Sequence, residues 1–307
     1  MQDGHEVVCF VRARAGASGG LAPDARARLL DGAMLRFGDV TDPASLAGDG
    51  FRGEHFDVLV SCLASRTGAP KDAWAIDYQA HVHALSAAHA AGVKHMILLS
   101  AICVQKPVLA FQNAKLALER VLMNSGLTYS IVRPTAYFKS LSGQIDRLKR
   151  GKPFVVFGSG TLTACKPISD GDLSRFIVEC LDDESRYNRV LPIGGPGDAI
   201  TPIQQGEHLF RLLNREPRFH HVPIALLDTI VALLGGLGRI VPPLGEKAEL
   251  ARIARYYATE SMLVLDPATG RYDASATPSA GSETLFDFYA RLIEGNASTE
   301  RGDHAIF

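Results

Sequence analysis

The sequence lacks the residue patterns that mark several classes of protein. Its five cysteines are scattered and form no C-x-x-C pair, so cysteine-ligated iron–sulfur clusters and structural zinc have little support. The ten histidines show no H-E-x-x-H or comparable spacing, and we expect no metal site. The formal net charge is −1, which favours no nucleic acid as partner. An odd set of scattered cysteines is typical of reduced thiols in a cytoplasmic protein, and we expect a cytoplasmic location.

Long uncharged apolar runs are also missing. No such run reaches 18 residues, so no membrane span is predicted. The nearest approach is 222–243, which Asp228, Arg239, three glycines and several prolines interrupt. A short apolar run is more often a buried helix than a functional surface. A second interpretation stays open, in which this segment is an apolar wall for a ligand or a peripheral contact with a membrane.

The glycine-rich turn that opens a dinucleotide-binding domain is not found in its usual place. That turn follows the first strand and lets backbone N–H groups and a helix N-terminus meet the pyrophosphate. Here Asp3-Gly4-His5 resembles the turn that leaves the first helix, just before the second strand. The literal G-x-G-x-x-G at 48–53 follows a helix-like segment and precedes a strand, the reverse of the required order. We expect the first strand and its turn to be missing, because the start is an internal methionine of a longer reading frame or because the chain is a truncated copy.

Strands and helices alternate over residues 1–150. β-Branched and aromatic runs indicate strands, and the run at 56–62 is apolar almost throughout, as in a parallel strand covered on both faces. This alternation is typical of a doubly wound parallel α/β sheet of the Rossmann-like, NADP-binding type. The predicted strands are residues 6–11, 33–42, 56–62, 94–100 and 129–133, and the predicted helices are residues 72–92 and 115–124.

After residue 150 the pattern loosens. Residues 151–295 are expected to form a smaller, mostly helical region on the substrate side. The tail, residues 296–307, is polar and is predicted to be frayed. Within 151–295 the predicted strands are 153–158 and 190–197, and the predicted helices are 170–181, 203–214, 223–235, 246–258 and 282–293.

The most informative stretch is residues 95–138. It contains a strand, a loop, a helix with Phe111-x-x-x-Lys115, a second strand and an Arg133-Pro134 corner. That order resembles the active-site half of a short-chain dehydrogenase/reductase, with phenylalanine in place of the usual catalytic tyrosine. Without the tyrosine hydroxyl, ordinary ketone or alcohol chemistry is not expected. A sugar-nucleotide epimerase is disfavoured for the same reason.

Three motifs carry a more specific resemblance: FQNAK at 111–115, ACKPIS at 164–169 and RYYATESML at 255–263. They are not general features of Rossmann domains. Together with the segments around them, from about Gly4 to about Glu294, they resemble the NADPH-dependent 3,8-divinyl (proto)chlorophyllide a 8-vinyl reductases. Those are atypical short-chain reductases of chlorophyll and bacteriochlorophyll synthesis, and phenylalanine at position 111 is part of their pattern.

The resemblance implies an oxidoreductase of photosynthetic pigment synthesis. NADPH would deliver a hydride to the 8-vinyl group of divinyl chlorophyllide a or divinyl protochlorophyllide a, and a proton would complete an ethyl group. Negative charge left after hydride addition can spread into the conjugated ring, so a hydroxyl that stabilises an alkoxide is dispensable. An enzyme of this kind would be cytoplasmic or peripheral to photosynthetic membranes. The sequence contains no indication of its oligomeric state.

Roles follow for individual residues, some from the resemblance and some from their place in the predicted fold. Lys115, which shares a helix face with Phe111, would hold the nicotinamide ribose hydroxyls. Tyr137 is the first candidate for the proton donor and Tyr78 the second, while the superfamily's catalytic serine falls near Ser100 or on Ala101. Further cofactor contacts are expected just after the strands, with an arginine suited to a 2′-phosphate. These residues are Arg12, Asp39, Val40, Cys62, Leu63, Ala64, Pro134, Thr135 and Ala136.

Two other functions compete with vinyl reduction. Some atypical short-chain reductases with a degraded active site bind NADP without turnover, so a non-catalytic regulator stays open. Such a regulator gives no reason for the apolar segment at 222–243, whereas a flat macrocycle needs an apolar cleft. The unrelated ferredoxin-linked vinyl reductases would need cysteine-ligated clusters, which the scattered cysteines do not favour.

Overall fold

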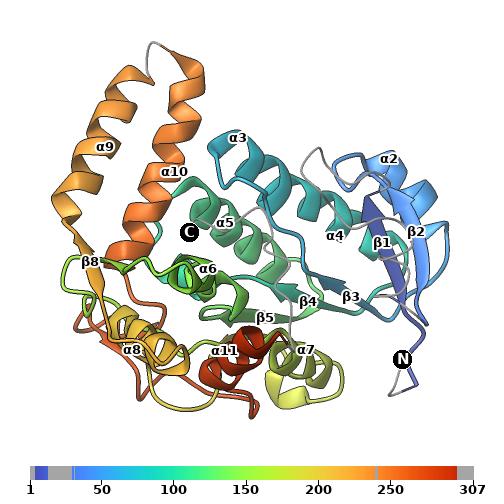
Figure 1. The fold of residues 1–307 in the computed structure, drawn as a ribbon. Coiled ribbons are helices and arrows are strands. Elements are labelled where there is room, and N and C mark those ends of the chain that lie inside the picture. The colour runs from blue at the N-terminus through green and yellow to red at the C-terminus, as the bar shows by residue number, and fades with distance from the viewer. Residues whose placement is uncertain (1–3, 13–29, 31, 239–240, 296–307) are drawn as a thin grey trace.

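The structure is a computed structural model that describes residues 4–12, 30, 32–238 and 241–295. Its central layer consists of parallel strands flanked by helices (Figure 1). The main sheet has the order β3-β4-β5-β7, and every neighbouring pair in it is parallel. These strands are β3 (Val58–Ser61), β4 (His95–Leu99), β5 (Thr128–Pro134) and β7 (Arg189–Ile193). The predicted parallel α/β fold is confirmed.

A second parallel pair, β1 (Val8–Arg12) and β2 (Met34–Gly38), lies beside the main sheet. Among the described strands, no hydrogen bonds join this pair to β3. Val60, in the middle of β3, is accordingly 43% exposed, although parallel strands inside a sheet are normally covered. The break between the β1–β2 pair and β3 falls at the place that strand 1 takes in the Rossmann strand order 3-2-1-4.

Helices cover both faces of the main sheet because the side chains of β4 alternate. Met96 and Leu98 pack into one apolar cluster with Leu118 of α5, whereas Ile97 packs into another with Leu173 of α7. Both faces of this strand are therefore buried, which explains its continuous apolar run. The helices around the sheet are α2 (Pro43–Ser45), η1 (Leu46–Phe51), α3 (Pro70–Ala73), η2 (Trp74–Ala80), α4 (His81–Ala90), η3 (Ile102–Gln105), α5 (Ala110–Met123), α7 (Asp170–Glu179) and η5 (Glu184–Arg186).

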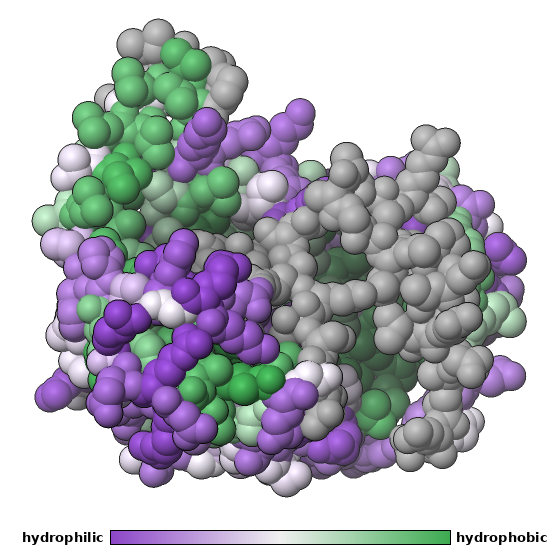
Figure 2. Space-filling model, viewed as in Figure 1, coloured by the Kyte–Doolittle hydropathy of each residue, from purple (hydrophilic) through white to green (hydrophobic). Residues whose placement is uncertain are grey.

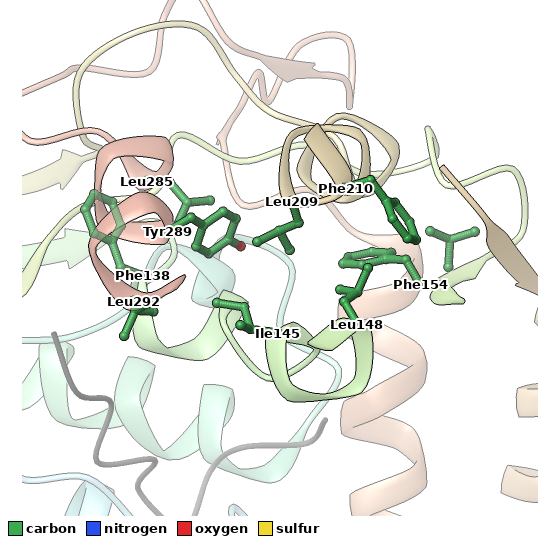
Figure 3. Packing of buried hydrophobic residues seen from close by; sticks show 10 residues of the cluster. Phe138, Ile145, Leu148, Phe154, Leu209, Phe210, Leu285, Tyr289 and Leu292 are labelled. Carbon is green, nitrogen blue, oxygen red and sulfur yellow. The ribbon is translucent and has the colours of Figure 1, made fainter. Parts of the chain in front are cut away.

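The chain after β5 builds a second apolar core beside the sheet. Tyr289, fully buried, packs in one cluster with Leu209 and Ile145, and its hydroxyl donates to the carbonyl oxygen of Leu141 at 2.7 Å. Figure 3 shows these side chains converging from separate helices. The elements of this region are η4 (Lys139–Leu141), α6 (Ile145–Lys149), β6 (Phe154–Phe157), α8 (Pro202–Leu212), β8 (Phe219–Val222), β9 (Val264–Leu265), β10 (Tyr272–Asp273) and α11 (Leu285–Glu294).

Two helices, α9 (Ile224–Leu237) and α10 (Pro242–Thr259), form a hairpin that projects from the body of the molecule (Figure 1). Arg255 of α10 forms an ion pair with Asp228 of α9, so the charge that interrupts the apolar run is neutralised within the hairpin. None of the helices among the described residues is long and apolar enough to cross a membrane.

Most predicted elements appear within a few residues of their predicted limits. The predicted helix 72–92 is divided into α3, the π-helical η2 and α4, and the predicted strand 33–42 ends at Gly38. The predicted frayed tail, residues 296–307, lies outside the described residues. The boundary between regions at residue 150 stays a prediction, since β7 returns from the later region to pair with β5.

Candidate active site

Many of the predicted site residues gather at the carboxyl ends of the main-sheet strands. Cys62 follows β3, Ser100 follows β4 and Pro134 ends β5, and these three strands run parallel. Ligands of open α/β sheets bind outside this edge. The expected cofactor residues at this edge are Cys62, Leu63, Ala64, Pro134, Thr135 and Ala136.

Lys115 is held at the same edge by a buried carboxylate. Its Nζ lies 2.9 Å from Asp77 Oδ1, and the two side chains are 12% and 0% exposed. The same carboxylate oxygen accepts a hydrogen bond from Ser65 N, in the loop after β3, at 3.1 Å. An ammonium that leaves water requires such a partner. Lys115 is therefore a fixed, largely buried cation rather than a solvated surface lysine.

Two buried acceptor atoms beside this ion pair have no hydrogen-bond partner within the described part of the chain: Asp77 Oδ2 and His81 Nε2. His81 Nδ1 lies 2.9 Å from Ile76 O, and since a carbonyl only accepts, Nδ1 carries the hydrogen and Nε2 keeps a lone pair. Burial, with a smaller effect of the Lys115 charge, lowers the pKa of His81 to about 4. Sequence reasoning missed Asp77 and His81; their spacing of four residues in a buried helical stretch was the available signal.

Ser100 belongs to a buried network and not to the open edge. Its Oγ donates to Glu119 Oε1 at 2.6 Å, and the same oxygen accepts from Arg133 Nε at 3.1 Å. Glu119 is 1% exposed, so the network is secluded from water. Ser100 and the arginine of the Arg-Pro corner thus join β4, α5 and β5. Ala101, the other candidate for the serine position, packs in an apolar cluster with Phe111.

Phe111 of α5 packs where α5, α10 and the loop after β3 meet. It packs with Ile253 of α10, and the loop after β3 approaches both of them. A Cβ atom on Gly68 would lie 3.0 Å from Ile253 Cδ1 and 3.4 Å from Phe111 Cδ1, and the φ angle of Gly68 is +68°. Only glycine fits that loop conformation without strain. Phe111 therefore contributes packing to the edge where the usual tyrosine would contribute a hydroxyl.

Tyr137 lies directly after β5 in a fixed backbone segment. The hydroxyl of Thr135 donates to the carbonyl oxygen of Lys166, which anchors the segment. Burial, with smaller contributions from neighbours such as Cys62, raises the pKa of Tyr137. Tyr78, by contrast, packs edge to face on a tryptophan with ring centroids 5.5 Å apart and joins the apolar cluster under α4. Its position suits core packing.

Arg12, Asp39 and Val40 lie at the carboxyl ends of the second strand pair. Arg12 ends β1, and Asp39 follows β2, its direct neighbour. Hydrogen bonds from Thr41, with a smaller effect of the Arg12 charge, lower the pKa of Asp39, so this carboxylate is ionised and shapes the turn after β2. The structure thus brings these three residues together, apart from the group around Lys115.

Sequence reasoning also missed the part played by α10. The hydroxyl of Tyr256 donates to the carbonyl oxygen of Cys103 at 2.9 Å, and Gln112 Nε2 donates to the same oxygen at 3.1 Å. Glu249 Oε1 accepts from Ala110 N, at the start of α5, at 3.2 Å. Helix α10 is thereby bound to the turn after β4 and to α5. It therefore lies beside Phe111 at the carboxyl edge.

Comparison with known proteins identifies the family. Residues 1–184 match the family described as NAD(P)H-binding. The chain is 50% identical over 313 residues to the protein named divinyl chlorophyllide a 8-vinyl-reductase, chloroplastic, of Zea mays, covering 100% of this chain and 78% of that protein. This chain belongs to the divinyl chlorophyllide a 8-vinyl-reductase family. The Arabidopsis thaliana protein of the same name is 50% identical over 311 residues, covering 98% of this chain and 74% of its own length.

Solved structures confirm the Rossmann-like fold of this 8-vinyl-reductase family member. The NADPH-dependent quinone oxidoreductase QOR2 of Escherichia coli, complexed with NADPH, has a TM-score of 0.65 at 19% identity and covers 93% of this chain and 90% of its own. The leucoanthocyanidin reductase–NADPH complex of Vitis vinifera has a TM-score of 0.65 at 13% identity, with coverages of 95% and 93%. At these identities the likeness concerns the fold alone.

The residues at the carboxyl edge fit a nicotinamide dinucleotide. Buried acceptors left without a donor are rare in proteins and are expected where a ligand brings hydroxyl or amide hydrogens. Asp77 Oδ2 and His81 Nε2 are two such acceptors beside the cation of Lys115. Among the described residues, no three His, Cys, Asp or Glu side chains lie together as a metal site would require.

Proposed function

We propose that this chain reduces the 8-vinyl group of divinyl chlorophyllide a to ethyl with NADPH as the hydride donor. The observation that carries the proposal is 50% identity over the whole chain to proteins named for that reaction. The vinyl group gains two hydrogens, one as a hydride with its electron pair and one as a proton. NADPH, when bound, supplies the hydride. Divinyl protochlorophyllide a is the second substrate we would test.

Lys115 and its neighbours are proposed to hold the cofactor. Lys115, fixed by Asp77, would donate to ribose hydroxyls, and Asp77 Oδ2 would accept from them. Arg12, at the end of β1, is proposed to meet the 2′-phosphate, because a guanidinium binds phosphate oxygens in a bidentate manner. Three further segments would line the cofactor. The loop after β3 would do so through the backbone of Cys62, Leu63 and Ala64. The turn after β2 would contribute Asp39 and Val40, and the segment after β5 would contribute Pro134, Thr135 and Ala136.

Tyr137 is proposed to supply the proton. A phenol carries its proton at neutral pH, and Tyr137 lies at the carboxyl edge, three residues after β5 and beside Cys62. Phe111 cannot take this part because it has no hydroxyl. Proton transfer to a carbanion breaks the phenol O–H bond and forms a C–H bond, and water then returns a proton to the phenolate.

The first test is turnover with NADPH and divinyl chlorophyllide a, followed by mass spectrometry. We expect a product heavier by two hydrogens, with one deuterium incorporated when the reaction runs in D₂O. The variant Lys115→Met should lose NADPH affinity, measured by nucleotide fluorescence, whereas the matched control Lys94→Met, at an exposed position, should not. NADPH binding without product would instead support the non-catalytic regulator. Full turnover by Tyr137→Phe would remove Tyr137 as the proton donor.

We further infer a peripheral contact between the α9 hairpin and a membrane. Four residues at helical spacing on one face of α9 are exposed: Leu226 (50%), Ile230 (36%), Leu233 (61%) and Leu237 (52%). Figure 2 shows apolar side chains over the projecting hairpin. At about 1.5 Å per residue, a helix of 14 residues is too short to span a bilayer but can lie on one.

Flotation with vesicles of phosphatidylcholine and phosphatidylglycerol tests this contact. Wild type should float with the vesicles, and the double variant Leu233→Ser/Leu237→Ser should not. Leu162→Ser is the matched control, because Leu162 is 52% exposed outside the hairpin. Unchanged flotation of the double variant would refute the membrane contact. A concentration-dependent dimer that the same variant abolishes would instead show that the four exposed residues of α9 bind a second copy of the chain.

A further inference from the structure

Helix α10 carries two adjacent tyrosines whose surroundings differ. The hydroxyl of Tyr256 is committed to the carbonyl oxygen of Cys103 at 2.9 Å, and its side chain is 4% exposed. Tyr257 is 40% exposed, yet its hydroxyl lies 3.8 Å from Cys103 Sγ. The ring of Tyr257 is therefore tethered at its inner end while part of its surface remains uncovered.

The exposed part of Tyr257 continues along α10. Leu250, seven residues earlier on the same helical face, is 48% exposed, and Ala254 lies between them. Helix α9 does not cover the face of α10 that carries Leu250 and Tyr257, because it contacts the face that carries Arg252 and Arg255. The remaining side of α10 packs on α5 and on the turn after β4 through Ile253. Leu250, Ala254 and Tyr257 thus form an apolar strip along α10.

This strip ends at the carboxyl edge of the main sheet. Cys103, which the Tyr257 hydroxyl contacts, belongs to the turn that follows β4. Burial of its hydroxyl end raises the pKa of Tyr257 well above 10, with smaller contributions from neighbours such as Cys103 and Tyr137. Tyr257 and Tyr137 therefore approach the edge from two different elements, α10 and the segment after β5.

We propose that Tyr257 is a pigment-binding residue, and that its tethered ring is the surface on which the flat conjugated macrocycle stacks. This inference rests on the proposed function and adds the residue that would position its substrate. A large planar π-system is recognised by an aromatic face of fixed orientation, since stacked rings gain both apolar contact and quadrupole complementarity. Tyr256 cannot serve in this way because its ring is buried in the contact between α10 and the turn.

The test separates the ring from the hydroxyl and binding from turnover. Affinity for divinyl chlorophyllide a is titrated without NADPH through the change in pigment absorbance and fluorescence. Tyr257→Leu, which removes the ring, should bind the pigment on the order of tenfold more weakly. Tyr257→Phe keeps the ring and should stay within about twofold of wild type. Phe37→Leu is the matched control, because Phe37 is an aromatic residue on β2 that is 47% exposed.

Kinetics supply a readout that a purely structural role would not move. In turnover, Tyr257→Leu should raise KM by about the same factor with kcat little changed, and its thermal unfolding should match that of wild type. Equal pigment affinity of Tyr257→Leu and wild type would overturn the proposal, as would equal losses in Tyr257→Phe and Tyr257→Leu. Failure of the proposed function has another signature: wild type would bind pigment through Tyr257 and form no product with two added hydrogens.

Discussion

The buried His81 gives a quantitative prediction about acid stability. Its ring is 1% exposed, and it faces the Lys115–Asp77 ion pair on one side and Ile76 O on the other. Burial lowers its pKa from 6.5 to about 4, so the folded state keeps it neutral where the unfolded chain would protonate it. A difference of this size corresponds to about 3 kcal/mol of stability.

The sign follows from proton binding. A group whose pKa is lowered on folding stabilises the native state above its unfolded pKa, and that contribution is lost as the pH falls. For His81 the loss begins near pH 6.5 and ends near pH 4, where the folded ring protonates as well. By pH 4.5 about 2.5 kcal/mol of the contribution should be gone.

The measurement compares wild type with His81→Gln by urea unfolding at pH 7.5 and at pH 4.5. Glutamine stays neutral and its amide can still donate to Ile76 O, so this variant should lose about 2.5 kcal/mol less than wild type between the two pH values. All carboxylates titrate in both proteins and cancel in the difference. His89→Gln, at an exposed position on the same helix, should behave as wild type. Parallel pH dependence of wild type and His81→Gln would show that His81 is already solvated or charged in the folded state, and the reasoning would fail.

Two further predictions concern packing and charge. Glu119→Gln should lower the free energy of unfolding in urea by about 3 kcal/mol, because the Arg133 guanidinium then loses its buried counter-charge. A decrease in that free energy of less than about 1 kcal/mol would contradict the buried ion pair. Gly195→Ala should lower the free energy of unfolding by about 3 kcal/mol or more, because a Cβ atom there would lie 1.9 Å from Pro167 O. Gly236→Ala in α9, where a Cβ atom meets open space, should leave the stability unchanged or raise it by up to about 1 kcal/mol. Equal melting temperatures for the two variants would refute the packing argument.

The motifs that carry the family resemblance turn out to hold the structure together more than they carry chemistry. In FQNAK, Gln112 caps α5 by accepting from Leu109 N at 3.0 Å and donates to Cys103 O. In RYYATESML, Tyr256 donates to that same oxygen, and Glu260 pairs with Lys106 at 2.7 Å. Motif residues far apart in the sequence therefore converge on one turn. Their spacing could identify the family but could not reveal that they bind α10 to the site.

The sequence by itself determined the parallel α/β fold, the family and the position of Lys115. Alternating apolar runs are local signals, and a motif of five residues on a helix needs no knowledge of its neighbours. Only the tertiary structure decided which polar groups meet. It paired Lys115 with Asp77, placed Ser100 in the network with Glu119, and brought Tyr257 to the edge that Tyr137 also reaches. Such contacts depend on chain segments more than a hundred residues apart in the case of α10, and no local pattern encodes which of them will touch.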